Sequence, residues 1–291
     1  GDHGGLKGMK RTAYRWLIAD AMKAERVITD SETSRELIRW EFGRECARAA
    51  IREEKNPNLA TAILHMSVVH AGCTLRSNGA AWLPWPRPAV LTLGINKPHK
   101  NLETLVRAIS LIPPDQRPLL VHAGPIDQRY PDVNALAKKH GIPGDVMQLD
   151  MVPEDRLAAL YRSAAIFAFP TLAEGFGLPL LEALTLGVPA LASDLPVLRE
   201  IAGDAAWLLP AEDAKLWANA ITTLLGDEML RSTMVQHGDA RASRYSYADA
   251  ALALIREYEQ LAPVLAQAAP AAHAAHAAHA AHGAELAAPG A

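Results

Sequence analysis

The pattern of hydrophobic and polar positions is most regular between residues 89 and 261, where short apolar runs alternate with stretches of helical period. The apolar runs are short enough to be buried strands, which we expect at residues 90–95, 118–123, 145–149, 164–169, 188–192 and 206–209. Helices are expected at residues 102–112, 133–140, 153–164, 197–201, 213–225, 228–242 and 247–261, and between Pro179 and Gly187. Strands that alternate with helices in this way predict a parallel, doubly wound α/β sheet.

The pattern is less regular before residue 89. We expect a helix over residues 12–23, a strand at residues 26–29, and a helix that is capped by Asp30 or Ser31 and runs to Gly43. Residues 46–56 favour a helix, residues 60–73 fit either a pair of strands or a helix, and residues 82–89, rich in Pro and Trp, predict a linker.

Composition narrows the class of protein. The chain has 291 residues, half of them hydrophobic, which is enough for one large domain or two ordinary ones. Its net charge of −3 gives no general attraction to nucleic acid or anionic lipid. Cys46 and Cys73 are expected as free thiols in a reducing compartment. No apolar run reaches the roughly 20 residues that span a bilayer, and the N-terminus lacks the apolar core of a signal peptide. A cytoplasmic protein is therefore expected.

The chain ends in a low-complexity segment of alanine, proline and a repeated Ala-Ala-His unit from Pro263 onward. Its repeat histidines recur every third residue and so drift around a helix instead of sharing one face; they are His273, His276, His279 and His282. A disordered tail is expected, with weak, non-specific metal binding as the alternative. The sequence also starts without Met, so we expect it to begin inside a longer chain.

Candidate chemistry is concentrated in residues 169–194, which read FPTLAEGFGLPLLEALTLGVPALASD. Glu174 precedes a glycine-rich loop and Glu182 lies on the helix that follows, so both carboxylates can accept hydrogen bonds from hydroxyl groups. Two glutamates at this spacing also occur by chance, and Gly187 is equally explained as a plain helix C-cap. The ordered sequence of strand, loop, helix and strand is what favours a site.

The glycine-rich loop of Gly175, Phe176 and Gly177 predicts an anion site. Glycines let backbone N–H groups come close to a ligand. Pro179 suits the first turn of a helix, whose amino end points free N–H groups and a partial positive charge at the loop. An anion flanked by two sets of hydroxyl groups is the outline of a nucleotide diphosphate sugar.

A second candidate follows the first strand of the regular region, where residues 94–101 read GINKPHKN. Lys100 lies beyond the carboxyl end of that strand, which is where open α/β sheets bind ligands. A lone lysine in a loop is otherwise simply solvated, so the residues on either side decide its interpretation.

Residues 169–194 resemble the C-terminal half of the retaining GT-B glycosyltransferases of family four, also called glycosyltransferase group 1. The usual pattern of that family is close to FPSxxEGFGLPxLEAMAxGxPVxAS, and this chain departs from it at Thr171, Leu184 and Thr185. Residues 24–37, AERVITDSETSREL, are similar to a segment late in the family's N-terminal domain. The resemblance extends over residues 24–261.

The resemblance implies an α/β fold of GT-B type. Residues 1–87 would be a truncated N-terminal, acceptor-side Rossmann-like portion with a linker, residues 88–262 a Rossmann-like donor domain, and residues 263–291 the disordered tail. It implies transfer of a sugar, with mannose favoured by the GINKPHKN loop, from a nucleotide diphosphate sugar to a hydroxyl group of a glycan or lipid-linked acceptor. Configuration would be retained, in polysaccharide or glycoconjugate synthesis.

No cofactor and no metal are expected, since the mechanism that the resemblance implies needs no metal and no Asp-x-Asp cluster is found in the sequence. Nucleic acid is not expected as a partner because of the net charge. Peripheral association with the inner face of the membrane would come through the missing N-terminal part.

By the same resemblance, the expected catalytic residues are Lys100, on the donor's diphosphate, and Glu174, on the hydroxyl groups of the sugar. Glu182 would hold the ribose. The expected donor-binding residues are Gly94, Asn96, Val152, Gly175, Phe176, Gly177, Leu178 and Glu182. Ile95 stands where many members have an arginine, which removes one cation from the leaving-group site.

Other interpretations fit the motifs less well. No GxGxxG joins a predicted strand to a helix, which argues against a nicotinamide-dependent enzyme, and no P-loop is found. A sugar-nucleotide epimerase shares the two-domain architecture but lacks the full EGFGLPxLE pattern. The remaining alternative is a truncated chain that binds a nucleotide sugar without transferring it.

Overall fold

The computed structural model describes residues 27–38, 66–68 and 84–260. The chain divides after Tyr247 into two units, and the first unit holds both sheets. The predictions for residues 12–23, for residues 46–56, for the two cysteines and for the histidine-containing tail lie outside the described residues. The expected domain boundaries near residues 87 and 262 stay predictions.

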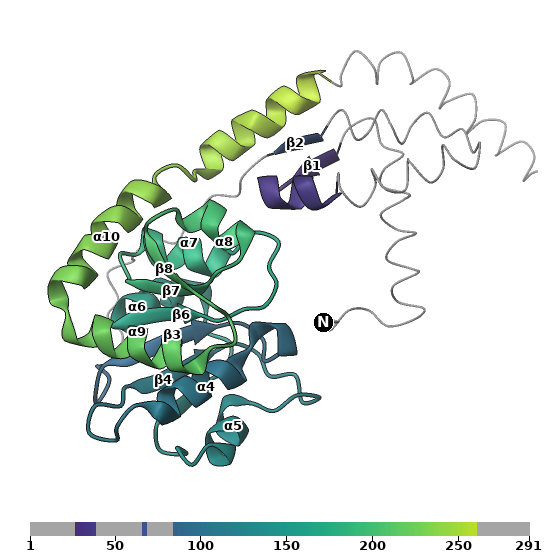
Figure 1. Ribbon diagram of the computed structural model, residues 1–291. Coiled ribbons are helices and arrows are strands. Elements are labelled where there is room, and N and C mark those ends of the chain that lie inside the picture. Colours follow the sequence, from purple (N-terminus) through teal and green to yellow (C-terminus); the bar gives the residue numbers. More distant parts are fainter. Residues whose placement is uncertain (1–26, 39–65, 69–83, 261–291) are drawn as a thin grey trace, which may run out of the picture. The chain divides into compact units, whose positions relative to one another are not determined.

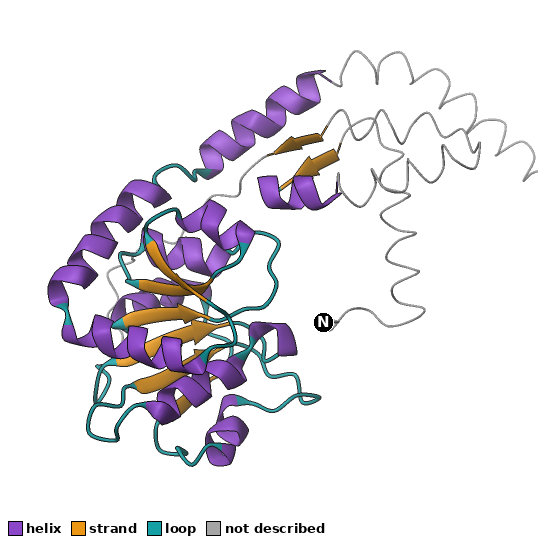
Figure 2. Cartoon of the chain, in the orientation of Figure 1, coloured by secondary structure: helices purple, strands orange, loops and turns teal. Residues whose placement is uncertain are grey.

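The main sheet has six parallel strands in the order β5-β4-β3-β6-β7-β8 (Figures 1 and 2). They are β3 (Ala89–Leu93), β4 (Leu119–Ala123), β5 (Val146–Leu149), β6 (Ile166–Phe169), β7 (Ala190–Ser193) and β8 (Ala206–Leu209). The chain moves outward from β3 through β4 to β5 and then returns to place β6 on the other side of β3. The predicted doubly wound parallel sheet is confirmed, and its direction reverses between β3 and β6, where such sheets bind ligands.

Helices cover both faces of this sheet (Figure 2). One face packs against α4 (Leu102–Leu111), α5 (Val133–Lys139) and α9 (Ala214–Gly226), and the other against α6 (Glu154–Ser163), α7 (Leu178–Thr185) and α8 (Pro196–Ala202). Successive strand residues such as Leu120 and Val121 enter opposite cores. Burial on both faces explains why these strands read as continuous apolar runs. α10 (Glu228–Ala242) and a helix over residues 247–260 follow.

The predicted elements of residues 89–260 are present, with ends that shift by about two residues or fewer. β3 ends at Leu93, before the predicted end, because Gly94 adopts a φ of +131° and turns the chain. A short 3-10 helix, η1 (Pro98–Lys100), was not predicted.

The described N-terminal residues form a small parallel pair of strands, β1 (Val27–Thr29) and β2 (Met66–Val68). β1 confirms the strand predicted at this position, and β2 decides residues 66–68 in favour of a strand. Ser31 precedes the helix at residues 32–38, and its Oγ accepts a hydrogen bond from the Ser34 N–H at 3.0 Å. This is the N-cap that the sequence predicts.

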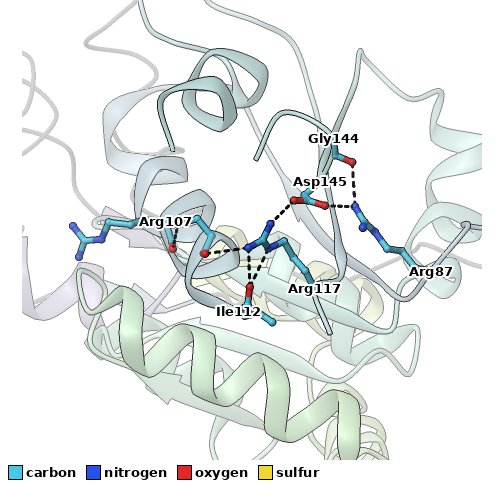
Figure 3. A network of polar contacts seen from close by, with 7 residues as sticks. Arg87, Arg107, Ile112, Arg117, Gly144 and Asp145 are labelled. Carbon is cyan, nitrogen blue, oxygen red and sulfur yellow. Dashed lines mark hydrogen bonds and ion pairs between the residues drawn. The ribbon is translucent and has the colours of Figure 1, made fainter. Parts of the chain in front are cut away.

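The amino ends of β3, β4 and β5 are joined by ionic contacts around Asp145 (Figure 3). The Asp145 carboxylate lies 2.7 Å from both Arg87 and Arg117. Burial would raise the pKa of Asp145, but hydrogen bonds from Arg117 and Arg87 outweigh it and lower that pKa. Arg117 also donates to the Ile112 carbonyl at 2.9 Å. This network fixes the sheet edge opposite to the candidate site.

Candidate functional site

Two loops meet at the point where the sheet reverses. One follows β3 and carries Lys100, and the other follows β6 and carries Glu174. The Lys100 Nζ lies 2.5 Å from the Glu174 Oε1, and the two side chains are only 16% and 14% exposed. The structure therefore brings the two predicted catalytic residues into direct contact.

Backbone geometry places Lys100. Gly94 leaves room for the lysine stem because it has no Cβ, which would lie only 3.3 Å from the Lys100 Cε. Asn101 adopts a left-handed φ of 53°, and its side-chain amide donates to the Pro170 carbonyl at 3.0 Å and to the Ala211 carbonyl at 2.7 Å. These contacts tie the loop after β3 to the loops after β6 and β8.

Thr171 orients Glu174. Its Oγ1 lies 2.8 Å from the Glu174 Oε1 and 3.0 Å from the His99 carbonyl oxygen. The side chain is fully buried, so the hydroxyl group is held between the two loops. The sequence did not single out Thr171 as a site residue, although it occupies the position of the serine in the FPSxxEGFG pattern and keeps the hydroxyl group.

The predicted anion loop leads into α7. Gly177 has a φ of +107° and precedes Leu178, the first residue of the helix, and Pro179 follows without an N–H. The N–H groups of Gly177 and Leu178 lie at the start of the helix, where no helical carbonyl can accept a hydrogen bond from them. The Phe176 side chain is buried and lies against Tyr245, with ring centroids 6.0 Å apart. Only the backbone of Phe176 is thus placed for a ligand.

Glu182 lies on α7 and is held by a residue that sequence reasoning missed. The Tyr161 hydroxyl donates to the Glu182 Oε2 at 2.6 Å. Burial raises the pKa of Glu182, the Tyr161 hydrogen bond lowers it, and the charge of Glu154 raises it, so that the net shift is upward. Tyr161 lies among apolar positions of α6, and its periodicity therefore indicates only a core residue.

Asn96 is buried, with 3% exposure, and its side chain is engaged within the chain. Its amide donates to the carbonyls of Asp127 and Tyr130 at 3.1 and 3.0 Å, and its Oδ1 accepts from the Asp127 N–H at 2.6 Å. The side chain fixes the loop after β4. Its predicted part in donor binding stays a prediction.

Val152 lines a surface hollow at the carboxyl end of β5. The hollow is formed by consecutive loop residues and the first turn of α6, namely Leu149, Asp150, Met151, Val152, Pro153 and Arg156. Val152 itself is half-buried and packs against the apolar core. The hollow adds an apolar surface at the same edge of the sheet as the two loops.

The described N-terminal residues also touch the β6 loop, which the sequence did not predict. The hydroxyl groups of Ser31 and Ser34 donate to the Gly175 carbonyl at 3.0 and 3.1 Å. The Glu200 carboxylate of α8 accepts from the Glu32 N–H at 2.8 Å and from the Thr33 N–H at 3.0 Å.

The described residues show neither a metal cluster nor a helix that could span a membrane. Across residues 27–38, 66–68 and 84–260, no group of three or more His, Cys, Asp or Glu side chains could hold a metal ion. Over the same residues, no helix has the length and apolar character needed to cross a bilayer.

Comparison with known sequences gives a family match over the sheet domain. The sequence model described as "Glycosyl transferases group 1" matches residues 83–241. The O-antigen chain mannosyltransferase B of Escherichia coli is 31% identical over 174 residues, which cover 59% of this chain and 45% of that protein. The phosphatidyl-myo-inositol mannosyltransferase of Mycolicibacterium smegmatis is 32% identical over 177 residues, which cover 58% and 44%. The chain spans less than half the length of these curated relatives.

Solved structures show a similar fold. A sucrose-phosphate synthase of Thermosynechococcus elongatus matches with a TM-score of 0.68 and 23% identity, over 89% of this chain and 64% of that one. The Anabaena protein HepE, in complex with UDP and glucose, matches with a TM-score of 0.67 and 19% identity, over 88% and 67%. At these identities the likeness shows the fold alone, and the predicted α/β fold of GT-B type is confirmed.

Proposed function

Because this chain belongs to the group 1 glycosyltransferases, we propose that it binds a nucleotide diphosphate sugar where β3 and β6 end, and that the protein transfers the sugar to an acceptor hydroxyl. The observation that carries this proposal is the contact between Lys100 and Glu174 at the reversal of the sheet, 2.5 Å apart. Lys100 then offers a cation to the diphosphate, and Glu174 beside it offers a carboxylate to the sugar hydroxyls. The diphosphate and the sugar are likewise adjacent in such a donor.

Lys100 and the N–H groups of Gly177 and Leu178 stabilise the departing diphosphate in this proposal. Transfer proceeds through an oxocarbenium-like transition state, in which negative charge grows on the leaving group. Donors fixed in place before the reaction stabilise such charge without reorganising. The largely buried side chain of Lys100, whose stem passes close to Gly94, supports this role. Retention of configuration is proposed on the family membership.

We assign the roles of the other donor-binding residues from their positions. Glu174 holds the sugar hydroxyls, with Thr171 fixing its carboxylate, and Glu182 holds the ribose, with Tyr161 fixing it. The hollow lined by Val152 accommodates the base. Gly94 and Asn96 shape the loop that carries Lys100.

We propose mannose as the sugar and a glycan or lipid-linked hydroxyl as the acceptor. Support comes from the matched relatives, which are named as an O-antigen chain mannosyltransferase and a phosphatidyl-myo-inositol mannosyltransferase. The competing proposal is a chain that binds the donor without transferring the sugar, and a transfer assay separates the two.

The test begins with UDP, GDP and ADP and their glucose and mannose conjugates, screened by thermal shift and measured by titration calorimetry. Lys100→Ala should weaken donor binding and raise the barrier of any turnover by ~2–4 kcal/mol. Lys97→Ala, in the same loop, is the matched control and should behave like the parent chain. EDTA should leave binding unchanged, since the proposal assigns no metal. Equal affinity and rate in Lys100→Ala would contradict the role of Lys100.

A further inference from the structure

The carboxylate of Glu200, on α8, holds the beginning of the helix at residues 32–38, although the two are far apart in the sequence. It accepts hydrogen bonds from the backbone N–H groups of Glu32 at 2.8 Å and Thr33 at 3.0 Å. The Thr33 hydroxyl donates to the same carboxylate at 2.8 Å. Hydrogen bonds to a charged acceptor are stronger than those between neutral groups, and the amino end of a helix favours negative charge. Three donors from one helical turn thus converge on one carboxylate.

Residues 31–34, the N-terminal turn, also hold the carbonyl group of Gly175, which directly follows Glu174. The hydroxyl groups of Ser31 and Ser34 donate to this carbonyl at 3.0 and 3.1 Å. Ser31 is fully buried, and a Cβ on Gly175 would lie 3.4 Å from the Asp30 Oδ2, so the turn and the loop are in close contact. Because a peptide unit is planar, the two hydroxyl groups fix the orientation of the peptide that follows Gly175.

The backbone of Glu200 is connected to the next residue of the same loop. The Tyr245 hydroxyl donates to the Glu200 carbonyl at 3.0 Å, and the Arg241 guanidinium donates to it as well. The ring of Tyr245 lies against Phe176, with ring centroids 6.0 Å apart. Gly175 is therefore held through its carbonyl and Phe176 through its ring, and Glu200 contacts both of the segments that hold them.

We propose that Glu200 is a positioning residue of the donor site, which keeps the N-terminal turn where its serines fix the loop after β6. This role depends on the proposed function and adds a residue to it. Since Glu174 directly precedes Gly175, the direction of its carboxylate toward a sugar depends on how the Gly175 peptide is held. The Gly177 carbonyl accepts from the N–H groups of α7, which fix the diphosphate end of the loop independently. Glu200 should therefore matter more for the sugar than for the diphosphate.

The contact itself can be tested without any ligand. Glu200→Gln keeps the size of the side chain and one acceptor oxygen, but it loses the charge and places an NH₂ group against an N–H donor. Hydrogen exchange of the full chain, followed by mass spectrometry, should become faster in this variant over residues 31–38 and over residues 172–177. Glu212→Gln, the same substitution at an exposed position before α9, is the matched control and should exchange like the parent. Unchanged exchange of Glu200→Gln in either segment would overturn the proposal.

The effect on the donor is measured by titration calorimetry with UDP and UDP-glucose or with GDP and GDP-mannose, whichever pair binds more tightly. Glu200→Gln should weaken binding of the nucleotide sugar about tenfold, the scale of one hydrogen bond to a charged group, and binding of the bare diphosphate by no more than about twofold. Thermal unfolding establishes that the variant is folded at the temperature of the titration. Equal losses for both ligands would mean that Glu200 is only structural, and unchanged affinity would mean that it does not position the loop.

Ser34 offers a milder variant that acts on the loop directly. Ser34→Ala removes one hydroxyl group from the Gly175 carbonyl and should weaken binding of the nucleotide sugar about fivefold. Ser34→Thr keeps the hydroxyl group and should bind like the parent. In the Glu200→Gln chain, Ser34→Ala should add little, because both changes release the same carbonyl. Additive losses would show that the two residues act independently and would contradict the positioning role of Glu200.

Failure of this role and failure of the proposed function give different results. If the parent chain binds the nucleotide sugar and Glu200→Gln binds it equally well, the proposed function stands and the positioning role is wrong. If the parent chain binds neither the nucleotide nor its sugar conjugate, the proposed function fails and the effect on the donor falls with it. Hydrogen exchange would still decide whether Glu200 holds the N-terminal turn against the loop after β6.

Discussion

At the scale of single residues, Lys100 and Glu174 are each other's partner, with 2.5 Å between the Nζ and the Oε1. A sugar donor that binds in the proposed way would have to interact with both side chains while they stay in contact. Removal of one charge therefore changes what the other can do. Glu174→Ala releases the ammonium group of Lys100 toward an anion while it removes the acceptor for sugar hydroxyls. This coupling makes the two predicted glutamates distinguishable by experiment.

Glu174→Ala should weaken binding of the nucleotide sugar but leave binding of the bare nucleoside diphosphate no weaker than in the parent. Glu182→Ala, assigned to the ribose, should weaken both ligands. Each lost hydrogen bond to a charged group is worth ~1.5–3 kcal/mol. Titration calorimetry measures both ligands, with Glu212→Ala as an exposed control. The reverse pattern would show that the two roles are exchanged.

Glu182 should also affect how stability depends on pH. Its pKa is raised above the ordinary value of 4.5, chiefly by burial, so the folded chain binds this proton more tightly than the unfolded chain does. The stabilisation is present at low pH and is lost as the pH rises through the raised pKa.

Glu182→Gln should therefore be more stable than the parent at neutral pH, and this advantage should vanish on acidification below the ordinary carboxyl pKa. Glutamine keeps the oxygen that accepts from Tyr161. Urea unfolding across a pH series measures the difference between the two chains. A constant difference at every pH would contradict burial as the origin of the shift.

The sequence indicated the residues with charge and missed those that orient them. Lys100, Glu174 and Glu182 stand in a recognisable order along the chain. Thr171 and Tyr161 act on those carboxylates from buried positions, and periodicity assigns such positions to the core. Only the fold brings a hydroxyl of α6 to a carboxylate of α7.

At the scale of elements, the apolar runs predicted the strands and the parallel sheet but not the order of the strands. The reversal between β3 and β6 depends on which runs pair, and pairing has no local signal in a run that is apolar throughout. The end of β3 was placed too late because Ile95 extends the apolar run, whereas the φ of Gly94 decides where the strand stops.

Substitution of Gly177 tests the geometry of the turn into α7. A Cβ there would lie 2.7 Å from the buried Leu198 side chain, and the φ of +107° is unfavourable for any residue with a side chain. Gly177→Ala should lower the free energy of unfolding by ~1–3 kcal/mol and weaken diphosphate binding, since the adjoining N–H groups move.

Gly226→Ala is the matched control for this variant. It lies at the end of α9, and an added Cβ would meet nothing within 4 Å, so its stability should equal or exceed that of the parent. Urea unfolding and calorimetry measure both variants. A Gly177→Ala chain as stable as Gly226→Ala would show that the turn tolerates a side chain.

At the scale of the whole molecule, the donor half of the function could be predicted further than the acceptor half. The motifs that identify the family lie in the sheet domain, and the structure assembles most of their residues at one edge. The described N-terminal residues 31–34 contact Gly175 in the loop after β6 and Glu200 on α8, which links the β1 region to both. No sequence motif marks these contacts, because serine hydroxyls and backbone N–H groups can donate hydrogen bonds to many acceptors.

The 291-residue chain by itself should transfer little sugar. Within residues 27–38, 66–68 and 84–260, our proposal assigns side chains to the donor but none to the acceptor. Holding both substrates in reacting geometry can supply ~7–11 kcal/mol of a barrier. We therefore expect measurable nucleotide binding, slow hydrolysis of the donor and little sugar transfer, as followed with a radiolabelled donor and extracted glycolipid acceptors. Efficient transfer to a defined acceptor would show that residues outside the described ranges complete an acceptor site.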